Sequence, residues 1–268
     1  VDRDTPMDLP DAGSMAFDSA TAEVPGSSID PDLVLWYPFD ETSGSIAYDM
    51  AQFGGVARNA TLVTAGSGGS AMFSSARRVG THALALSPGA NASSGGGYVV
   101  IPALNTLAPG AVTIAVWVNL AAATSNQAWE RIYDFGDSTT APAWLNLTAR
   151  NQANPFGPIF NMSKTGHATP DQQKLTGSTA LTSNTWHHIA VVLPADATFT
   201  GVMYLDGAVA ATNNAMTVHF SDIGATANNW LGRSEFTNDP YFNGSLDDFR
   251  VYRRDLSQQE VQALMALR

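Results

Sequence analysis

Cysteine is absent from the 268-residue sequence, which excludes disulfide bonds and metal sites built on thiolates. Charged residues are scarce at 14%, and 13 basic side chains face 24 acidic ones, so the net charge is −11. Nucleic acids and anionic membrane surfaces select proteins with a basic face, so this balance argues against both as partners. It permits cations, neutral sugars or basic proteins as partners.

Long hydrophobic runs are also absent. The longest, residues 111–123, is interrupted by Asn119 and is shorter than the roughly 20 apolar residues that span a bilayer. We therefore expect no membrane insertion. The chain begins at Val1 and is rich in Gly, Ser, Thr, Asn and Ala, a composition common among exported bacterial proteins. These features favour a secreted or cell-surface bacterial protein, and the missing basic-then-apolar leader means that either a leader was cleaved or the sequence was trimmed.

Helix signals are nearly missing as well, whereas short strands separated by turn residues fill the chain after residue 32. Asp206–Gly207 is a strong hairpin signal between two such strands. One helix is predicted after Asp255, where Ser257 and Glu260 have the spacing of a capping box. Numerous strands with one short C-terminal helix predict an all-β, antiparallel jelly-roll β-sandwich. The predicted strands cover residues 33–37, 83–86, 98–101, 112–118, 131–135, 143–147, 186–193, 201–205, 208–211 and 246–252.

Residues 1–31 differ from the rest and form a predicted acidic, low-complexity N-terminal arm. The first 30 residues contain seven acidic side chains, one basic side chain and three prolines, without any periodicity. Such a segment buries too little apolar surface to fold alone, which predicts a solvated linker. If the arm is ordered, its own domain, a neighbouring copy or a metal must hold it. Residues 32–268 show no internal boundary and are predicted to form one domain.

Several motifs after residue 32 follow the order typical of a known family. They are Trp36-Tyr-Pro-Phe-Asp-Glu-Thr-Ser-Gly44, Val112-Thr-Ile-Ala-Val-Trp117, Trp186-His-His-Ile-Ala190, Tyr204-Leu-Asp-Gly207 and Gly244-Ser-Leu-Asp-Asp-Phe-Arg-Val-Tyr252. Residues 33–268 thus resemble the laminin G-like, concanavalin A-like jelly rolls found beside bacterial glycoside hydrolases and in surface proteins. The resemblance implies a sandwich whose first and last strands are neighbours. It leaves function open among sugar-binding modules, adhesion domains and spacers.

Three aspartates from the two ends of the predicted domain, Asp40, Asp247 and Asp248, are candidate metal ligands. Because the resemblance implies neighbouring terminal strands, these carboxylates could converge on one cation. Calcium takes about six to eight oxygen ligands, and backbone carbonyls complete the set. Many jelly rolls hold a structural calcium at this position, so the resemblance implies Ca²⁺ as a structural cofactor. The alternative is that Asp40 caps a turn and the other two are solvated or pair with Arg250 or Arg253.

Sugars are recognised by aromatic faces that stack on their rings and by polar groups that bond to their hydroxyls. The sequence offers side chains of both kinds near predicted strand ends or loops: Trp129, Arg131, Trp144, Trp230, Arg233 and Tyr241. We expect glycan recognition at the loop of residues 233–242 and at the strand ends near Trp129 and Trp144. The alternative is that these aromatic side chains pack beneath long loops.

Two other patterns favour structural roles. Asp134 and Asp137 flank Gly136 and suit turn chemistry better than ligand binding. His187 and His188 are consecutive in a predicted strand, so they point to opposite faces and cannot chelate one metal together.

Catalytic motifs are absent from the sequence. It lacks the Glu-x-Asp-x-Glu strand of jelly-roll glucanases that resemble this fold, and it lacks Gly-x-Ser-x-Gly, His-Glu-x-x-His and phosphate-loop motifs. We therefore predict a non-catalytic, extracellular carbohydrate-binding or adhesion module stabilised by calcium. One alternative is a structural subunit whose residues 1–30 contact a neighbouring subunit, for example in a homo-oligomer. The other is an accessory domain of a larger glycoside hydrolase.

Overall fold

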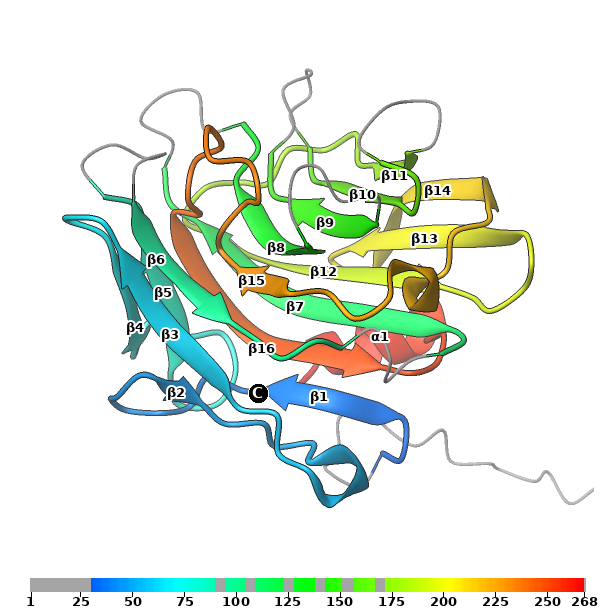
Figure 1. Cartoon of the computed structure of the whole chain (residues 1–268). Helices are drawn as coiled ribbons and strands as arrows, with labels where there is room; N and C mark the ends of the chain where they lie inside the picture. Colours follow the sequence, from blue (N-terminus) through cyan, green and yellow to red (C-terminus); the bar gives the residue numbers. More distant parts are fainter. Residues whose placement is uncertain are drawn as a thin grey trace, which may run out of the picture.

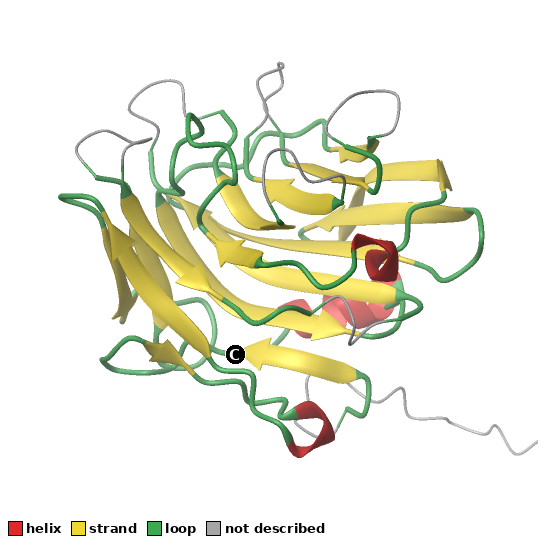
Figure 2. Ribbon diagram, in the orientation of Figure 1, coloured by secondary structure: helices red, strands yellow, loops and turns green. Residues whose placement is uncertain are grey.

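The computed structural model describes residues 30–89, 95–104, 109–122, 128–137, 143–150, 157–166 and 172–267. Two eight-stranded antiparallel sheets form a sandwich, which confirms the predicted all-β jelly roll (Figure 2). Residues 1–29 lie outside the described residues, so the role expected for the N-terminal arm stays a prediction.

Sheet I contains β1 Leu33–Tyr37, β4 Ser70–Ser74, β5 Ala83–Ser87, β7 Val112–Leu120, β12 Trp186–Leu193, β13 Phe199–Leu205, β14 Ala208–Met216 and β16 Gly244–Tyr252. Its strand order is β14-β13-β12-β7-β16-β5-β4, and β1 pairs with β16 beside this path. Sheet II contains β2 Ile46–Ala47, β3 Ala60–Ala65, β6 Gly96–Val100, β8 Arg131–Gly136, β9 Trp144–Thr148, β10 Ile159–Ser163, β11 Gln173–Thr176 and β15 Asn228–Leu231. Its order is β11-β10-β9-β8-β15-β6-β3-β2.

The first and last strands are neighbours, as the resemblance implied. Leu35 lies opposite Val251 and Tyr37 lies opposite Phe249 in the antiparallel pair of β1 and β16. Figure 1 shows β1, in blue, alongside β16, in orange. Residues that are more than 200 positions apart are therefore neighbours in sheet I.

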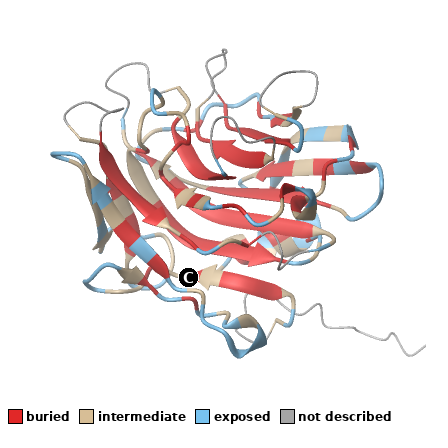
Figure 3. Ribbon diagram, viewed as in Figure 1, coloured by how far each residue is buried: buried red, intermediate tan, exposed pale blue. Residues whose placement is uncertain are grey.

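Alternate positions along the strands send apolar side chains into the space between the sheets. On β9, Leu145 and Leu147 belong to this core, whereas Trp144, Asn146 and Thr148 point to the opposite face of sheet II. All five are buried, so the outer face of sheet II is itself partly covered (Figure 3). This covered outer face is where the candidate site lies.

Helix α1, Gln258–Met265, covers the outer face of sheet I. The Ser257 hydroxyl accepts from the Glu260 amide at 3.3 Å, and the Glu260 carboxylate accepts from the Ser257 amide at 2.7 Å, which confirms the predicted capping box. Val261 and Leu264 of the helix pack with buried residues of β7, β12 and β13 in a second apolar cluster. The pocket described below is thus on the other side of the molecule from α1.

The predicted hairpin at Asp206–Gly207 is confirmed between β13 and β14. Both residues have positive φ, 51° and 74°, as the tight turn of a two-residue hairpin requires. The strands β2, β3, β4, β10, β11 and β15 were not predicted, since each is at most six residues long and, β2 excepted, mixes polar residues with its apolar ones. Two short 3-10 segments, η1 Phe53–Gly55 and η2 Phe220–Ile223, were also not predicted.

Candidate functional site

A row of side chains crosses the outer face of sheet II. Trp230 on β15 lies opposite Asp134 on β8, and Asp134 lies opposite Asn146 on β9. Asn146 is in turn opposite Asn161 on β10, and Asn161 is opposite Lys174 on β11. Residues directly opposite one another on adjacent strands share a face, so five strands present one row that is aromatic at one end and cationic at the other.

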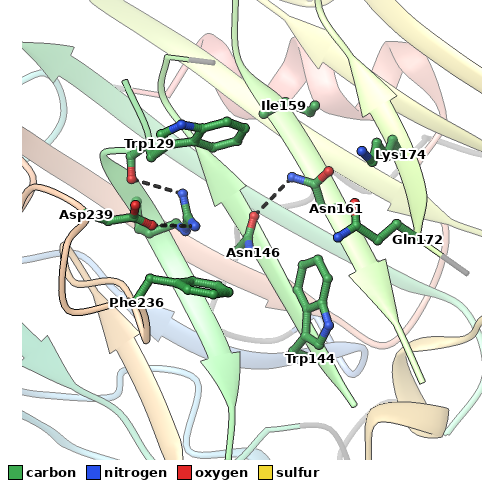
Figure 4. A pocket seen from close by; sticks show the side chains of 10 residues that line it. Trp129, Trp144, Asn146, Ile159, Asn161, Gln172, Lys174, Phe236 and Asp239 are labelled. Atoms are coloured by element: carbon green, nitrogen blue, oxygen red, sulfur yellow. Dashed lines mark hydrogen bonds and ion pairs between the residues drawn. The ribbon is translucent and has the colours of Figure 1, made fainter. Parts of the chain in front are cut away.

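The β8–β11 part of this face forms a pocket of about 330 Å³. Figure 4 shows Trp129, Phe236 and Asp239 on one side, Asn161 and Lys174 on the other. The volume is at the lower end of the roughly 300–1,000 Å³ range of ligand pockets. The described residues that line it are Trp129, Arg131, Trp144, Asn146, Ile159, Asn161, Gln172, Lys174, Phe236 and Asp239.

Two asparagines lie at the centre of the pocket. Asn161 donates from Nδ2 to Asn146 Oδ1 at 3.2 Å, and both side chains are buried. An amide carries two donor hydrogens and one acceptor oxygen, so this single bond leaves each residue with further hydrogen-bonding capacity. The pair can therefore both donate to and accept from hydroxyl groups.

Trp129 and Trp144 supply indole rings to the pocket. Trp144 comes from the first position of β9 and is 3% exposed. Trp129 precedes β8 and has a φ of 74°, a left-handed conformation that is unfavourable for a large side chain and persists only where the surroundings hold it. Its amide donates to the Arg150 carbonyl at 2.8 Å. The Trp129 backbone is thus held in the conformation from which its ring lines the pocket.

Arg131 lines the pocket, but its guanidinium is bonded to the protein itself. It pairs with Asp134 at 3.1 Å and with Asp239 at 2.8 Å. Its Nη1 donates to the Trp129 carbonyl at 2.9 Å and to the Thr148 hydroxyl at 3.0 Å. The structure therefore gives Arg131 the role of positioning the pocket wall rather than of a free ligand-binding cation.

The loop of residues 232–243 crosses the outer face of sheet II and completes the pocket with Phe236 and Asp239. Buried carboxylates of β8 and of the residue before it hold this loop. Asp134 accepts from the Glu235 amide at 3.2 Å, and Glu130 accepts from the Asn243 amide at 3.2 Å. The loop that the sequence singled out and the two tryptophans thus meet at one pocket.

Burial raises the pKa of three acids in and beneath this loop. The pKa of Asp134 is raised to about 6, with Arg131 opposing the shift, and the pKa of Glu130 is raised to about 7 against the opposing charge of Arg150. Glu235, close to Asp134 and Asp137, has a pKa raised to about 7, mainly by desolvation. Deprotonation of these groups near neutral pH adds negative charge under the loop.

Trp230, Arg233 and Tyr241 form a separate cluster over β6 and β15. The Arg233 guanidinium carbon is 4.1 Å from the centroid of the Trp230 ring and 4.8 Å from that of Tyr98. Tyr241 is 5.9 Å from the same carbon. These cation–π contacts hold the guanidinium against the three rings, of which Trp230 and Tyr241 are partly exposed, away from the pocket lining. The structure therefore divides the predicted sugar-binding set, placing only Trp129, Arg131 and Trp144 at the pocket.

The three aspartates expected to bind calcium each have protein partners. Asp40 accepts from the backbone amides of Thr81 and His82 and so caps a turn. Asp247 accepts from the amides of Arg78 and Val79 at 2.7 and 2.9 Å.

Asp248 accepts from the Trp36 indole at 2.7 Å and pairs with Arg250 at 2.9 Å. Among the residues that the structure describes, no group of three or more His, Cys, Asp or Glu side chains is placed to hold a metal ion. Calcium binding by Asp40, Asp247 and Asp248 stays a prediction.

Several pocket residues had no signal in the sequence: Asn146, Ile159, Asn161, Gln172, Lys174, Phe236 and Asp239. Asn161 and Lys174 are on β10 and β11, which were not predicted as strands. Phe236 and Asp239 are in the loop that was expected to carry recognition, although neither was named. The pairing register of strands β8 to β11 brings the residues of these strands together in one pocket.

Comparison with known proteins identifies the family. A laminin G domain model, described as the concanavalin A-like lectin/glucanases superfamily, matches residues 93–262. The chain therefore belongs to that superfamily. No curated protein matches it by sequence. Within the described residues, no helix is long and apolar enough to cross a membrane.

Solved structures with the same fold differ widely in sequence. Domain 4 of AbnA, an extracellular GH43 arabinanase from Geobacillus stearothermophilus in complex with arabinotriose, has a TM-score of 0.63 at 16% identity, covering 87% of this chain and 98% of that one. A Trypanosoma rangeli sialidase in complex with 2,3-difluorosialic acid has a TM-score of 0.55 at 16% identity, with 87% and 33% covered. The binding domain of botulinum neurotoxin DC in complex with rat synaptotagmin II has a TM-score of 0.60 at 12% identity, with 87% and 51% covered. The chain thus spans about a third and a half of the latter two, and all three similarities concern the fold.

Proposed function

We propose that this protein is a non-catalytic carbohydrate-binding module whose binding site is the pocket on the outer face of sheet II. The observation that carries the proposal is the combination of Trp129 and Trp144 with the Asn146–Asn161 amide pair in one pocket. Sugar rings present apolar C–H faces and a rim of hydroxyls, which match aromatic rings and amides respectively. The small volume suits the end of a glycan chain better than a long stretch of it.

The comparison with the arabinanase domain supports this proposal. That domain is bound to arabinotriose, and its length is almost fully matched by this chain. At 16% identity the similarity concerns the fold, so the argument for sugar binding rests on the residues of this pocket.

The charge arrangement supports binding without catalysis. Most glycosidases use two carboxyl groups at a defined separation. Of the described residues that line the pocket, Asp239 is the one with a carboxylate, and Arg131 and Ser234 both donate to it at 2.8 Å. A carboxylate held in this way serves the structure of the pocket wall.

The location, the cofactor and the wider role of this module are proposed on grounds other than the pocket. An extracellular location follows from composition and suits glycan binding. A structural Ca²⁺ near Asp40, Asp247 and Asp248 follows from the family resemblance. An accessory role beside a glycoside hydrolase would use the same pocket. Assembly through residues 1–30 concerns a segment that is almost wholly outside the described residues, and it stays an alternative prediction.

Glycan binding is tested with an array of neutral and acidic glycans and with Trp144→Ala and Asn161→Ala variants. We expect a subset of glycans to bind the parent protein and both substitutions to weaken that binding at least about tenfold, as loss of a buried contact does. Trp186→Ala is the matched control, because Trp186 is a half-buried tryptophan on β12 of the other sheet. Binding to no glycan on the array, or an equal loss of glycan binding in Trp186→Ala, would contradict the proposal.

A further inference from the structure

The chain contains two lysines, and one of them, Lys174, lines the pocket. Lys174 is half-buried on β11 opposite Asn161. The other, Lys164, is 48% exposed and pairs with Asp222 at 3.5 Å. In the part of the chain that the structure describes, no carboxylate forms an ion pair with Lys174. Lysine side chains are mostly exposed, so a half-buried lysine in a pocket lining is less common than a solvated one.

The other cation of the pocket is already neutralised. Arg131 pairs with both Asp134 and Asp239. Among the described lining residues, Lys174 is the charged side chain that forms no ion pair, and it faces the same cavity as the Asn146–Asn161 pair (Figure 4). This arrangement is matched by a ligand that carries one negative charge next to hydroxyl groups.

The net charge of −11 does not remove this attraction. At physiological ionic strength, charges on the protein surface are screened beyond a Debye length of about 8 Å. Lys174 acts at contact distance inside a partly desolvated pocket, where screening is weaker and an ion pair with hydrogen bonds is shorter and stronger than a neutral hydrogen bond. Carboxylates elsewhere on the protein surface therefore oppose this attraction only weakly.

We infer that the pocket selects a carboxylated sugar, such as a uronic or sialic acid, whose carboxylate pairs with Lys174 Nζ. The hydroxyls of the same sugar bond to Asn146 and Asn161, and its apolar face lies against Trp144. This inference rests on the proposed glycan binding and narrows it from sugars in general to anionic ones.

The test is calorimetric titration of the full chain at neutral pH in about 150 mM salt, the ionic strength assumed above. The probes are oligogalacturonate and sialyllactose, with galacto-oligosaccharide and lactose as their uncharged counterparts. Lys174→Gln removes the proposed partner of the carboxylate, and Lys164→Gln removes a lysine outside the pocket. Thermal melts verify that both variants fold.

We expect at least one carboxylated probe to bind about tenfold more tightly than its neutral counterpart, as a charge-assisted hydrogen bond provides. Lys174→Gln is expected to abolish that difference, and Lys164→Gln to preserve it. Binding of oligogalacturonate would indicate a site for uronic acids, and binding of sialyllactose would indicate a site for sialic acids. Equal affinity for charged and neutral probes, or an unchanged preference in Lys174→Gln, would overturn the inference and leave glycan binding intact. No binding by any probe would count against the proposed function itself.

Discussion

Arg131 and Asp239 form an ion pair with 2.8 Å between Nη2 and Oδ2, and this pair joins β8 to the 232–243 loop. The two residues are 108 positions apart in the chain. Arg131 also holds the Trp129 carbonyl, so one guanidinium fixes both the loop side and the tryptophan side of the pocket. The shape of the pocket therefore depends on this pair.

Replacing Asp239 with Asn is expected to destabilise the protein by about 2 kcal/mol, because a largely buried arginine loses one of its two charged partners. Asp134 still neutralises Arg131, which keeps the cost below that of an isolated buried charge. Glycan affinity is expected to fall as well, since the loop is held less firmly. Urea unfolding and glycan titration measure the two effects.

Lys164→Gln provides the control for that experiment, because its exposed pair with Asp222 contributes at most about 1 kcal/mol. If Asp239→Asn changes stability no more than this surface substitution does, the Arg131–Asp239 pair does not hold the loop.

The raised pKa of Glu235 predicts that stability falls as pH rises through the acidic-to-neutral range. Its folded pKa is about 7 against an ordinary value of 4.5, so between these values the native state binds the extra proton. Stability from this group is complete below pH 4.5 and is lost as the pH rises through 7. We expect the loss to be about 1–2 kcal/mol, given partial solvent screening.

Glu235→Gln mimics the protonated carboxyl and tests this assignment. The variant is expected to be more stable than the parent at pH 8 and nearly equal to it at pH 5, because it cannot ionise next to Asp134 and Asp137. Denaturant melts at both pH values measure the difference. A parent-minus-variant difference that does not change with pH would show that Glu235 titrates normally.

Calcium binding by the aspartates at the chain ends is tested by removal of the metal. If Ca²⁺ binds near Asp40, Asp247 and Asp248, saturating calcium should raise the melting midpoint by about 5 °C or more over EDTA-treated protein, since a ligand that binds only the folded state stabilises it. An unchanged midpoint would rule out a structural calcium. In that case the turn contact of Asp40 and the indole and arginine contacts of Asp248 give these two residues structural roles without a metal.

Local signals predicted the fold well. The alternation of residues 112–118 and 246–252, the Asp206–Gly207 turn and the Ser257–Glu260 capping box each depend on neighbours within a few positions, and all of them appear in the structure. Strands such as β10 and β11 were not predicted, because pairing with neighbouring strands, rather than their own composition, makes them strands.

The candidate site was only partly predictable, because its geometry is set by long-range order. Trp129 and Trp144 both line the pocket, although they lie at opposite ends of the β8–β9 pair. In the sequence, Trp230 is as good a candidate for the sugar site as the other two tryptophans. In the structure, β15 lies between β8 and β6, so Trp230 packs against Arg233 and Tyr98 rather than lining the pocket. Lys174 carries no local signal at all, and its place in the pocket depends on the registers that link β8 through β11.

The location of the sugar is tested most directly by the indole N–H resonances of the six tryptophans during titration with a glycan that binds. Single Trp→Phe variants assign the signals. The pocket predicts that the signals of Trp129 and Trp144 shift in proportion to saturation, while those of Trp36, Trp117 and Trp186 stay in place. Shifts confined to Trp36, Trp117 or Trp186, or unchanged Trp129 and Trp144 signals at saturation, would contradict a binding site on the outer face of sheet II.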